Sequence, residues 1–182
     1  MKIYEKKHTN PVALFKHLKS LKERGAIIER EQNVLKYYFP ILWYHGTTKD
    51  FKKFSFKYFG KTDAGWWGYG IYFHTEKDRG AYGNIIKVVE LNFNNVINFP
   101  TNNAGKYLYK LIGIKAGLKE SYMSESPMNI IKAIGKVEFR DICLKNGFDG
   151  MIIEYAGGTK EAVVFDAKII AIKDTIQVQY YT

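Results

Sequence analysis

Three side chains that could bind a ligand or take part in catalysis lie beside glycines in this 182-residue chain. His45 ends a short apolar stretch and is followed by Gly46, whose bare backbone lets a ligand amide approach closely. Tyr72 lies in a glycine-flanked strand pattern, and Glu161 follows the glycine pair 157–158 at the start of an apolar run. An imidazole can hydrogen-bond a hydroxyl, a phenol ring can stack, and a carboxylate can stabilise positive charge. Taken singly, each residue also has an ordinary structural role, in packing or at the surface.

The stretch 42–73 contains all three tryptophans, and 12 of its 32 residues are aromatic, against 16% for the chain. Packing alone does not account for that density so close to glycines. Aromatic rings offer flat surfaces on which a planar ligand can stack. The stretch therefore predicts a pocket for a nucleotide-like molecule, with His45 at its edge. Within it, residues 49–61 alternate lysines with aromatics, which suits a phosphate-bearing ligand or an ordinary solvated loop.

Taken together and in order, three strings resemble the His–Tyr–Glu pattern of ADP-ribosyltransferases. They are Tyr44-His45-Gly46-Thr47, Gly68-Tyr69-Gly70-Ile71-Tyr72-Phe73 and Glu161-Ala162-Val163-Val164-Phe165-Asp166. The similarity is to the diphtheria-toxin and poly(ADP-ribose)-polymerase branch, and most of all to small bacterial and phage members found in polyvalent proteins and toxin–antitoxin systems. It covers residues 42–93 and 147–173, but not 1–40 or 101–147.

The resemblance implies a split antiparallel sheet with NAD, as co-substrate, in the cleft, and it implies no metal. The NAD-binding residues implied are His45, Gly46, Thr47, Tyr72 and Tyr82. His45 would bond the adenosine ribose, and the Gly46 main chain would hold the nicotinamide amide. Tyr72 and Tyr82 would sandwich the nicotinamide ring. The catalytic residue implied is Glu161, bonded to the 2′-hydroxyl of the nicotinamide ribose.

The chemistry agrees with those roles. Cleavage of the nicotinamide–ribose bond passes through an oxocarbenium-like sugar, which a preorganised carboxylate stabilises. Two positions depart from related branches. Thr159, two residues before Glu161, argues against the arginine-modifying branch, and Arg79 replaces a serine that polymerases often have before the second tyrosine. Glu154 is a rival acid, but it precedes the glycine turn, so Glu161 is favoured.

The composition restricts the partners and the compartment. Lys and Arg total 28 against 18 Asp and Glu, a net charge of +10, which favours a polyanionic partner or simply a lysine-rich soluble surface. The single cysteine, Cys143, allows no internal disulfide. No signal-like or membrane-spanning run is present, so we expect no membrane partner and a cytoplasmic protein, or one delivered into a target cell without a cleaved signal peptide.

The hydrophobic patterns predict an α+β fold with a largely antiparallel sheet, an N-terminal helix and a helical insert. Residues 1–40 are expected to form a helical lead-in packed on the core, and residues 41–182 to form the ADP-ribosyltransferase-like domain. Helices are expected from residue 11 to about 25 and in three segments of 101–147: one over 104–116, one that starts at the Ser126-Pro127 pair, and one over 138–146. The expected strands cover 42–45, 70–73, 85–93, 150–155, 162–166, 169–172 and 175–181, and a short helix is expected around 77–82.

The leading functional hypothesis is an NAD-dependent mono-ADP-ribosyltransferase acting on a macromolecule. The charge favours RNA or DNA slightly over protein as the acceptor. By resemblance, it would be a toxin or phage-defence effector with an antitoxin or immunity protein as a partner. The alternatives are transfer to protein, an NAD glycohydrolase with water as the nucleophile, and an inactive relative that binds nucleic acid or protein. The presence of Glu161 argues against the inactive relative.

Overall fold

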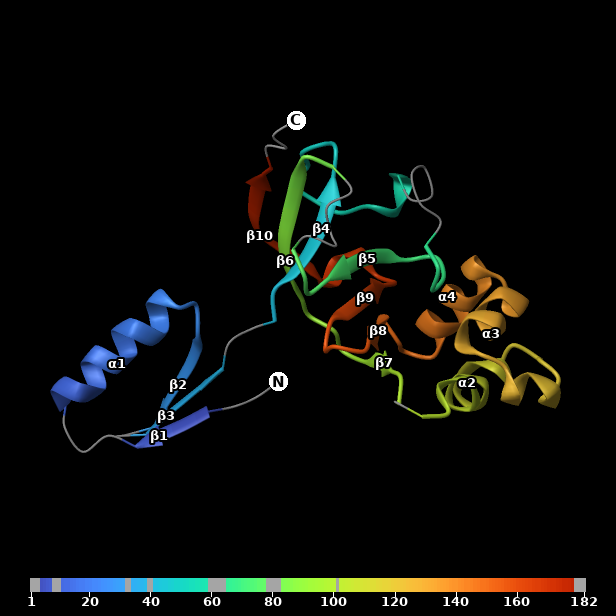
Figure 1. The fold of residues 1–182 in the computed structure, drawn as a ribbon, viewed down its shortest axis with the longest axis horizontal. Coiled ribbons are helices and arrows are strands. Elements are labelled where there is room, and N and C mark those ends of the chain that lie inside the picture. The colour runs from blue at the N-terminus through green and yellow to red at the C-terminus, as the bar shows by residue number, and fades with distance from the viewer. Residues whose placement is uncertain are drawn as a thin grey trace. The chain divides into compact units, whose positions relative to one another are not determined.

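The computed structural model describes residues 4–7, 11–31, 34–38, 41–58, 65–77, 83–100 and 102–178 (Figure 1). The chain forms two compact units, Met1–Leu42 and Trp43–Thr182. Each unit has its own sheet, and each is described by itself below.

The first unit combines one helix with a small antiparallel sheet. Its elements are β1 (Tyr4–Lys7), α1 (Pro11–Glu23), β2 (Ile27–Glu31) and β3 (Val34–Tyr38), with strand order β1-β3-β2. Leu14 and Leu21 lie on one helix face and are buried against Ile28 and Tyr37. Gly25, with φ of 73°, turns the chain out of the helix. The helix was predicted from sequence and the three strands were not. The packing of residues 1–40 on the core stays a prediction.

The second unit is built on a seven-stranded sheet of order β10-β6-β4-β5-β9-β8-β7. Its strands are β4 (Trp43–Thr47), β5 (Ile71–His74), β6 (Ile85–Leu91), β7 (Val96–Asn98), β8 (Gly150–Glu154), β9 (Lys160–Val164) and β10 (Ile170–Gln177). All neighbours are antiparallel except the pair β7 and β8, which is parallel. The predicted α+β class with a largely antiparallel sheet is confirmed.

The sheet is split between β4 and β5. Strand β4 pairs with β6 through five residue pairs, but with β5 only through Tyr44 and His74. The two halves, β10-β6-β4 and β5-β9-β8-β7, therefore diverge from a single point of pairing (Figure 1). Such a divergence opens the backbone edges of β4 and β5 on either side of the split, which is the place where the resemblance puts NAD.

Two strand predictions need correction. The expected break between 169–172 and 175–181 is instead a bulge between Ile172 and Asp174 within one strand, β10. Strand β7 was missed because Val96–Asn98 is only three residues long and has little pattern to detect. Most of the short helix expected at 77–82 lies outside the described residues.

A helical insert follows β7. It contains α2 (Ala104–Leu108), a π-helical turn (Tyr109–Gly113), a 3-10 segment (Glu120–Ser124), α3 (Pro127–Ile134) and α4 (Lys136–Lys145). The predicted start at Ser126 is confirmed, because its side chain accepts a bond of 3.3 Å from the Asn129 amide. The helix expected over 104–116 is interrupted by the π turn. Within the described ranges, no helix has both the length and the hydropathy needed to cross a bilayer.

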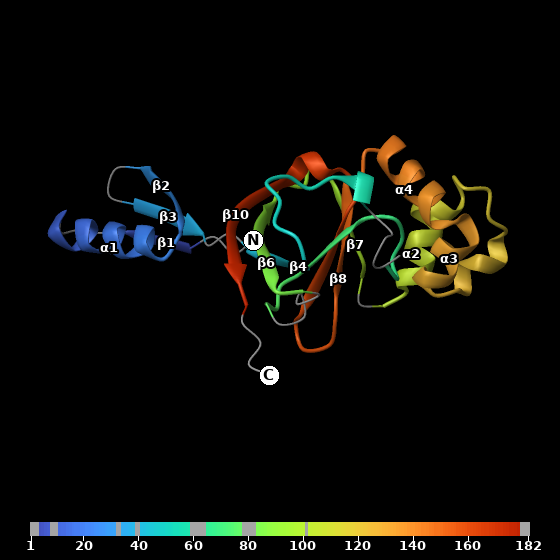
Figure 2. The ribbon, with the colours of Figure 1, turned by 90° about the horizontal axis from the view of Figure 1, so that it is seen from above.

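The helical insert covers one face of the sheet, and this is the face on which Glu161 lies. Helices α2, α3 and α4 gather at one side of the sheet (Figure 2). Ile130 and Phe139 from the insert share a buried core with Val163 of β9. Because side chains alternate along a strand, Glu161 lies on the same face of β9 as Val163, whereas Ala162 packs in the core on the other face. Glu161 therefore lies on the helix-covered face of β9, next to the hydrophobic core and not within it.

Candidate active site

His45 is held at the split by a backbone contact. Its Nδ1 donates a hydrogen bond of 2.8 Å to the carbonyl oxygen of Tyr72 on the neighbouring strand. Burial lowers the pKa of the imidazole, the bond to Tyr72 opposes that shift, and nearby His74 adds to it. The ring is thus neutral at neutral pH with its proton on Nδ1, because a carbonyl can only accept. Nε2 then presents a lone pair, which suits a hydroxyl donor such as a ribose.

Tyr72 is fixed by contacts with the segment that precedes β5. Its hydroxyl donates to the Gly68 carbonyl (2.8 Å) and accepts from the Trp67 amide (2.9 Å). Gly65 lies directly against the ring: a Cβ there would be 2.1 Å from the Tyr72 hydroxyl oxygen, and φ at Gly65 is +61°. Both features require glycine. The Tyr72 ring is therefore a preset flat surface and not a mobile side chain.

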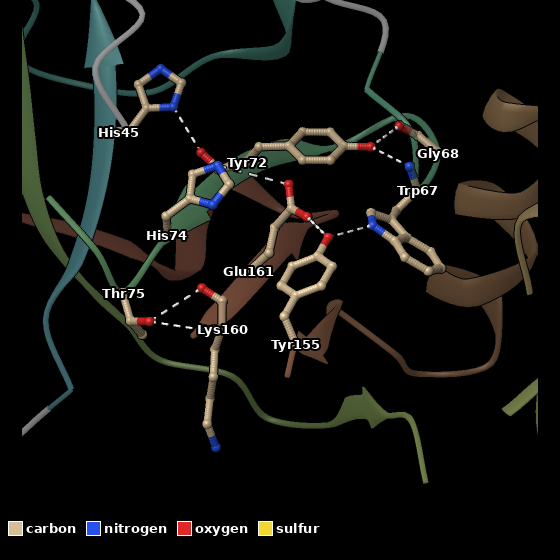
Figure 3. A network of polar contacts seen from close by, with 9 residues as sticks. All are labelled: His45, Trp67, Gly68, Tyr72, His74, Thr75, Tyr155, Lys160 and Glu161. Carbon is tan, nitrogen blue, oxygen red and sulfur yellow. Dashed lines mark hydrogen bonds and ion pairs between the residues drawn. The ribbon is translucent and has the colours of Figure 1, made fainter. Parts of the chain in front are cut away.

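Glu161 is only 8% exposed, and both of its oxygens have partners (Figure 3). The Tyr155 hydroxyl donates to Oε2 and itself accepts a bond of 3.1 Å from Trp67 Nε1. His74 Nε2 lies 3.8 Å from Oε1. A carboxylate held in this way needs no reorganisation to face a developing cation. It has the properties expected of the acid in glycosidic bond cleavage.

Strand pairing joins the three residues of the His–Tyr–Glu pattern. His45 is in β4, Tyr72 in β5 and Glu161 in β9, and these strands are consecutive in the sheet. His74 pairs directly with Glu161 across β5 and β9, and Tyr72 lies two residues before His74 on the same face. Tyr72 and Glu161, 89 positions apart in sequence (161 − 72), are thus brought onto neighbouring strands (Figure 3).

The other predicted binding residues lie at the end of β4 or outside the described chain. Gly46 follows His45 in β4, opposite Ile86 of β6. Thr47 ends the strand, and its hydroxyl accepts a bond of 3.2 Å from the Lys49 amide. Tyr82 is outside the described residues.

Sequence reasoning missed three members of the network: Trp67, His74 and Tyr155. His74 is not among the residues singled out from the sequence, yet its side chain is only 17% exposed and lies 3.8 Å from Glu161. Its position two residues after Tyr72 was the available signal, since strand alternation puts both on one face. Tyr155 had no such signal, because its proximity depends on the hairpin between β8 and β9. The rival acid Glu154 is exposed and forms an ion pair with Lys160 (3.0 Å).

A family model described as "ADP-Ribosyltransferase in polyvalent proteins" matches residues 39–175. The chain belongs to this family. The matched range includes all three strands of the site and also the helical insert, which the sequence resemblance had not covered. Membership supports ADP-ribosyl transfer in general, and members of the family use NAD as a substrate.

Two further comparisons add little. No curated protein matches. One solved structure, titled as the M. tuberculosis MbcT–MbcA toxin–antitoxin complex, is similar to the present chain. The superposition covers 88% of the present chain and 91% of the chain in that structure, with 12% sequence identity and a TM-score of 0.42. At that level of similarity, no functional argument follows for the present protein.

Proposed function

We propose that this protein cleaves the nicotinamide–ribose bond of NAD and transfers ADP-ribose to a macromolecule, with nucleic acid favoured as the acceptor. The observation that supports this most strongly is the carboxylate of Glu161, buried and bonded by Tyr155, on the strand beside Tyr72. Residues 41–182 hold every residue to which we assign a role.

In the proposed complex, His45 Nε2 accepts a bond from the adenosine ribose, and the Gly46 main chain holds the nicotinamide amide beside Thr47. Tyr72 and Tyr82 enclose the nicotinamide ring. The bond between C1′ and the pyridinium nitrogen breaks, and its electron pair leaves with neutral nicotinamide. Glu161 stabilises the resulting oxocarbenium-like ribose through its 2′-hydroxyl. A nucleophile of the acceptor then bonds to C1′ and releases its proton.

Tyr155 acts as a positioning residue in this scheme. Its hydroxyl donates to Glu161 Oε2 and accepts from Trp67 Nε1, so it directs one carboxylate oxygen. A hydrogen bond to a charged group contributes about 1.5–3 kcal/mol, more than an ordinary neutral bond. The orientation of the acid therefore depends on a tyrosine six residues earlier.

Nucleic acid is favoured as the acceptor because the chain carries a net charge of +10. Transfer to protein and hydrolysis of NAD by water remain alternatives with the same first step. A buried carboxylate that accepts a hydrogen bond from Tyr155 beside the split favours an enzyme over an inactive binding module.

The test is incubation of the protein with NAD labelled in its adenosine half and separate pools of RNA, DNA and protein. We expect label on nucleic acid and free nicotinamide, both lost in Glu161→Gln but retained in the matched control Glu154→Gln. Nicotinamide without transfer would show a glycohydrolase. If no pool is labelled and no nicotinamide is released by the wild-type protein, the enzymatic proposal is wrong.

We further propose a toxin or phage-defence role in the cytoplasm, with an antitoxin or immunity protein as a partner. The support is the sequence resemblance alone. Induced expression should arrest growth for the wild-type protein and not for Glu161→Gln. Growth arrest by both forms would contradict a role based on the transferase reaction.

A further inference from the structure

A groove of about 490 Å³ lies beside the site, between the segment before β5 and helix α3. The residues that line it are Gly65, Trp66, Met128, Asn129, Ile131, Lys132 and Lys136. Gly65 also lies against the Tyr72 ring, since a Cβ added there would be 2.1 Å from the Tyr72 hydroxyl oxygen. Gly65 therefore belongs both to the groove and to the surroundings of Tyr72.

Trp66 is the most unusual member of the groove, because 76% of its surface is exposed. Its neighbour Trp67 bonds to Tyr155 and packs beside Phe99. The two consecutive indoles therefore have different surroundings, Trp67 in the site network and Trp66 in the groove. A tryptophan exposed to this degree contributes little hydrophobic stabilisation to the fold. Such exposed rings are typical of surfaces that bind a partner.

The charged side chains that line the groove are lysines, and the lining residue Asn129 donates a hydrogen bond of 2.6 Å to Glu125. Lys132 is exposed on α3, and Lys136 donates to the Gly65 carbonyl, so its ammonium lies at the groove wall. Within the described part of the chain, the lining includes two lysines and no carboxylate. An exposed indole flanked by two ammonium groups suits a partner that alternates flat bases with phosphates.

We propose that this groove binds the single-stranded nucleic acid that accepts ADP-ribose, with a base stacked on Trp66 and a phosphate near Lys132 and Lys136. This inference rests on the proposed function and names its substrate class. An acidic peptide would satisfy the lysines but would lack a regular flat ring for Trp66. Binding beside Gly65 also brings the acceptor next to Tyr72.

The test uses the full chain and a fluorescently labelled single-stranded RNA, followed by anisotropy. Stacking is worth about 1–3 kcal/mol per base, so Trp66→Ala should weaken binding by about tenfold or more. Lys132→Gln should weaken it and reduce the salt slope by about one. The matched controls are Phe15→Ala, another exposed aromatic residue, and Lys168→Gln, another exposed lysine; both should bind as wild type.

A spectroscopic readout identifies the ring directly. Trp43 is buried and Trp67 is partly buried, so base stacking should quench mainly the emission of Trp66. Trp66→Phe should keep most of the binding but lose most of the quenching. Unchanged binding in Trp66→Ala, an equal loss in the controls, or stronger competition by polyglutamate than by unlabelled RNA would each overturn the proposal.

Failure of the groove proposal is separable from failure of the proposed function. Release of nicotinamide from NAD does not require the groove, so Trp66→Ala should retain that activity while losing transfer to RNA. Loss of both activities with an unchanged melting temperature would place Trp66 in the NAD site and would overturn its assignment to the acceptor.

Discussion

Replacement of Tyr155 by phenylalanine tests the arrangement of the site most directly. The substitution removes one hydroxyl, which donates to Glu161 Oε2 and accepts from Trp67 Nε1, and it leaves the ring in place. His74 still lies 3.8 Å from the other carboxylate oxygen. Glu161 therefore keeps its strand position and loses only one of its two orienting contacts.

The size of the effect follows from that bond. A hydrogen bond to a charged group is worth about 1.5–3 kcal/mol. If this bond orients the acid in the transition state, kcat for nicotinamide release should fall by about 10- to 100-fold, at roughly tenfold per 1.4 kcal/mol. We expect the Kd for NAD to change by less than about twofold, because in the proposed complex the hydroxyl of Tyr155 touches the acid and not the ligand.

Stability must be measured alongside activity. The matched control is Tyr109→Phe, which removes a buried tyrosine hydroxyl that donates to the Leu118 carbonyl (3.3 Å) in the helical insert. Tyr109→Phe should lose about 1 kcal/mol of unfolding free energy, typical of one hydrogen bond, and Tyr155→Phe about 1.5–3 kcal/mol, because its bond is to a charged group; only Tyr155→Phe should lose activity. Wild-type kcat in Tyr155→Phe, or an equal loss of kcat in both variants, would refute the positioning role.

Three further predictions concern the parts that hold the site. Gly65→Ala should raise the Kd for NAD and lower stability, because its Cβ would meet the Tyr72 hydroxyl at 2.1 Å. The control Gly117→Ala, with φ of +72° and open space around it, should lower stability alone. Titration with NAD and thermal melts measure the two effects. The folded-state pKa of His45 lies below 6.5, so at acid pH the unfolded chain binds more protons than the folded chain does. The unfolding free energy of the wild-type protein should therefore fall as the pH drops below 6.5, and that of His45→Gln should fall less. Lys87 is 2% exposed and bonds to Asp50, which is 66% exposed. Asp50→Asn should therefore lower the melting temperature more than Lys87→Met does, because only Asp50→Asn leaves a buried ammonium without its counter-ion.

Local patterns were sufficient for most elements of the second unit. β-branched runs predicted β6 and β8, and the Ser-Pro pair predicted the start of α3. These signals depend on neighbouring residues, so the sequence contains them completely. The strands of the first unit were missed because their apolar residues are broken by charges, and β10 was divided in two because a bulge shifts the alternation of its side chains.

The sequence by itself determined the family and the three side-chain types of the pattern, since the short strings around His45, Tyr72 and Glu161 are local. Only the tertiary structure decided how these residues are held. The single pairing between Tyr44 and His74 opens the sheet, and the pairing of β5 with β9 sets His74 beside Glu161. Both depend on contacts between segments distant in the chain, and such contacts leave no periodic trace in a single sequence.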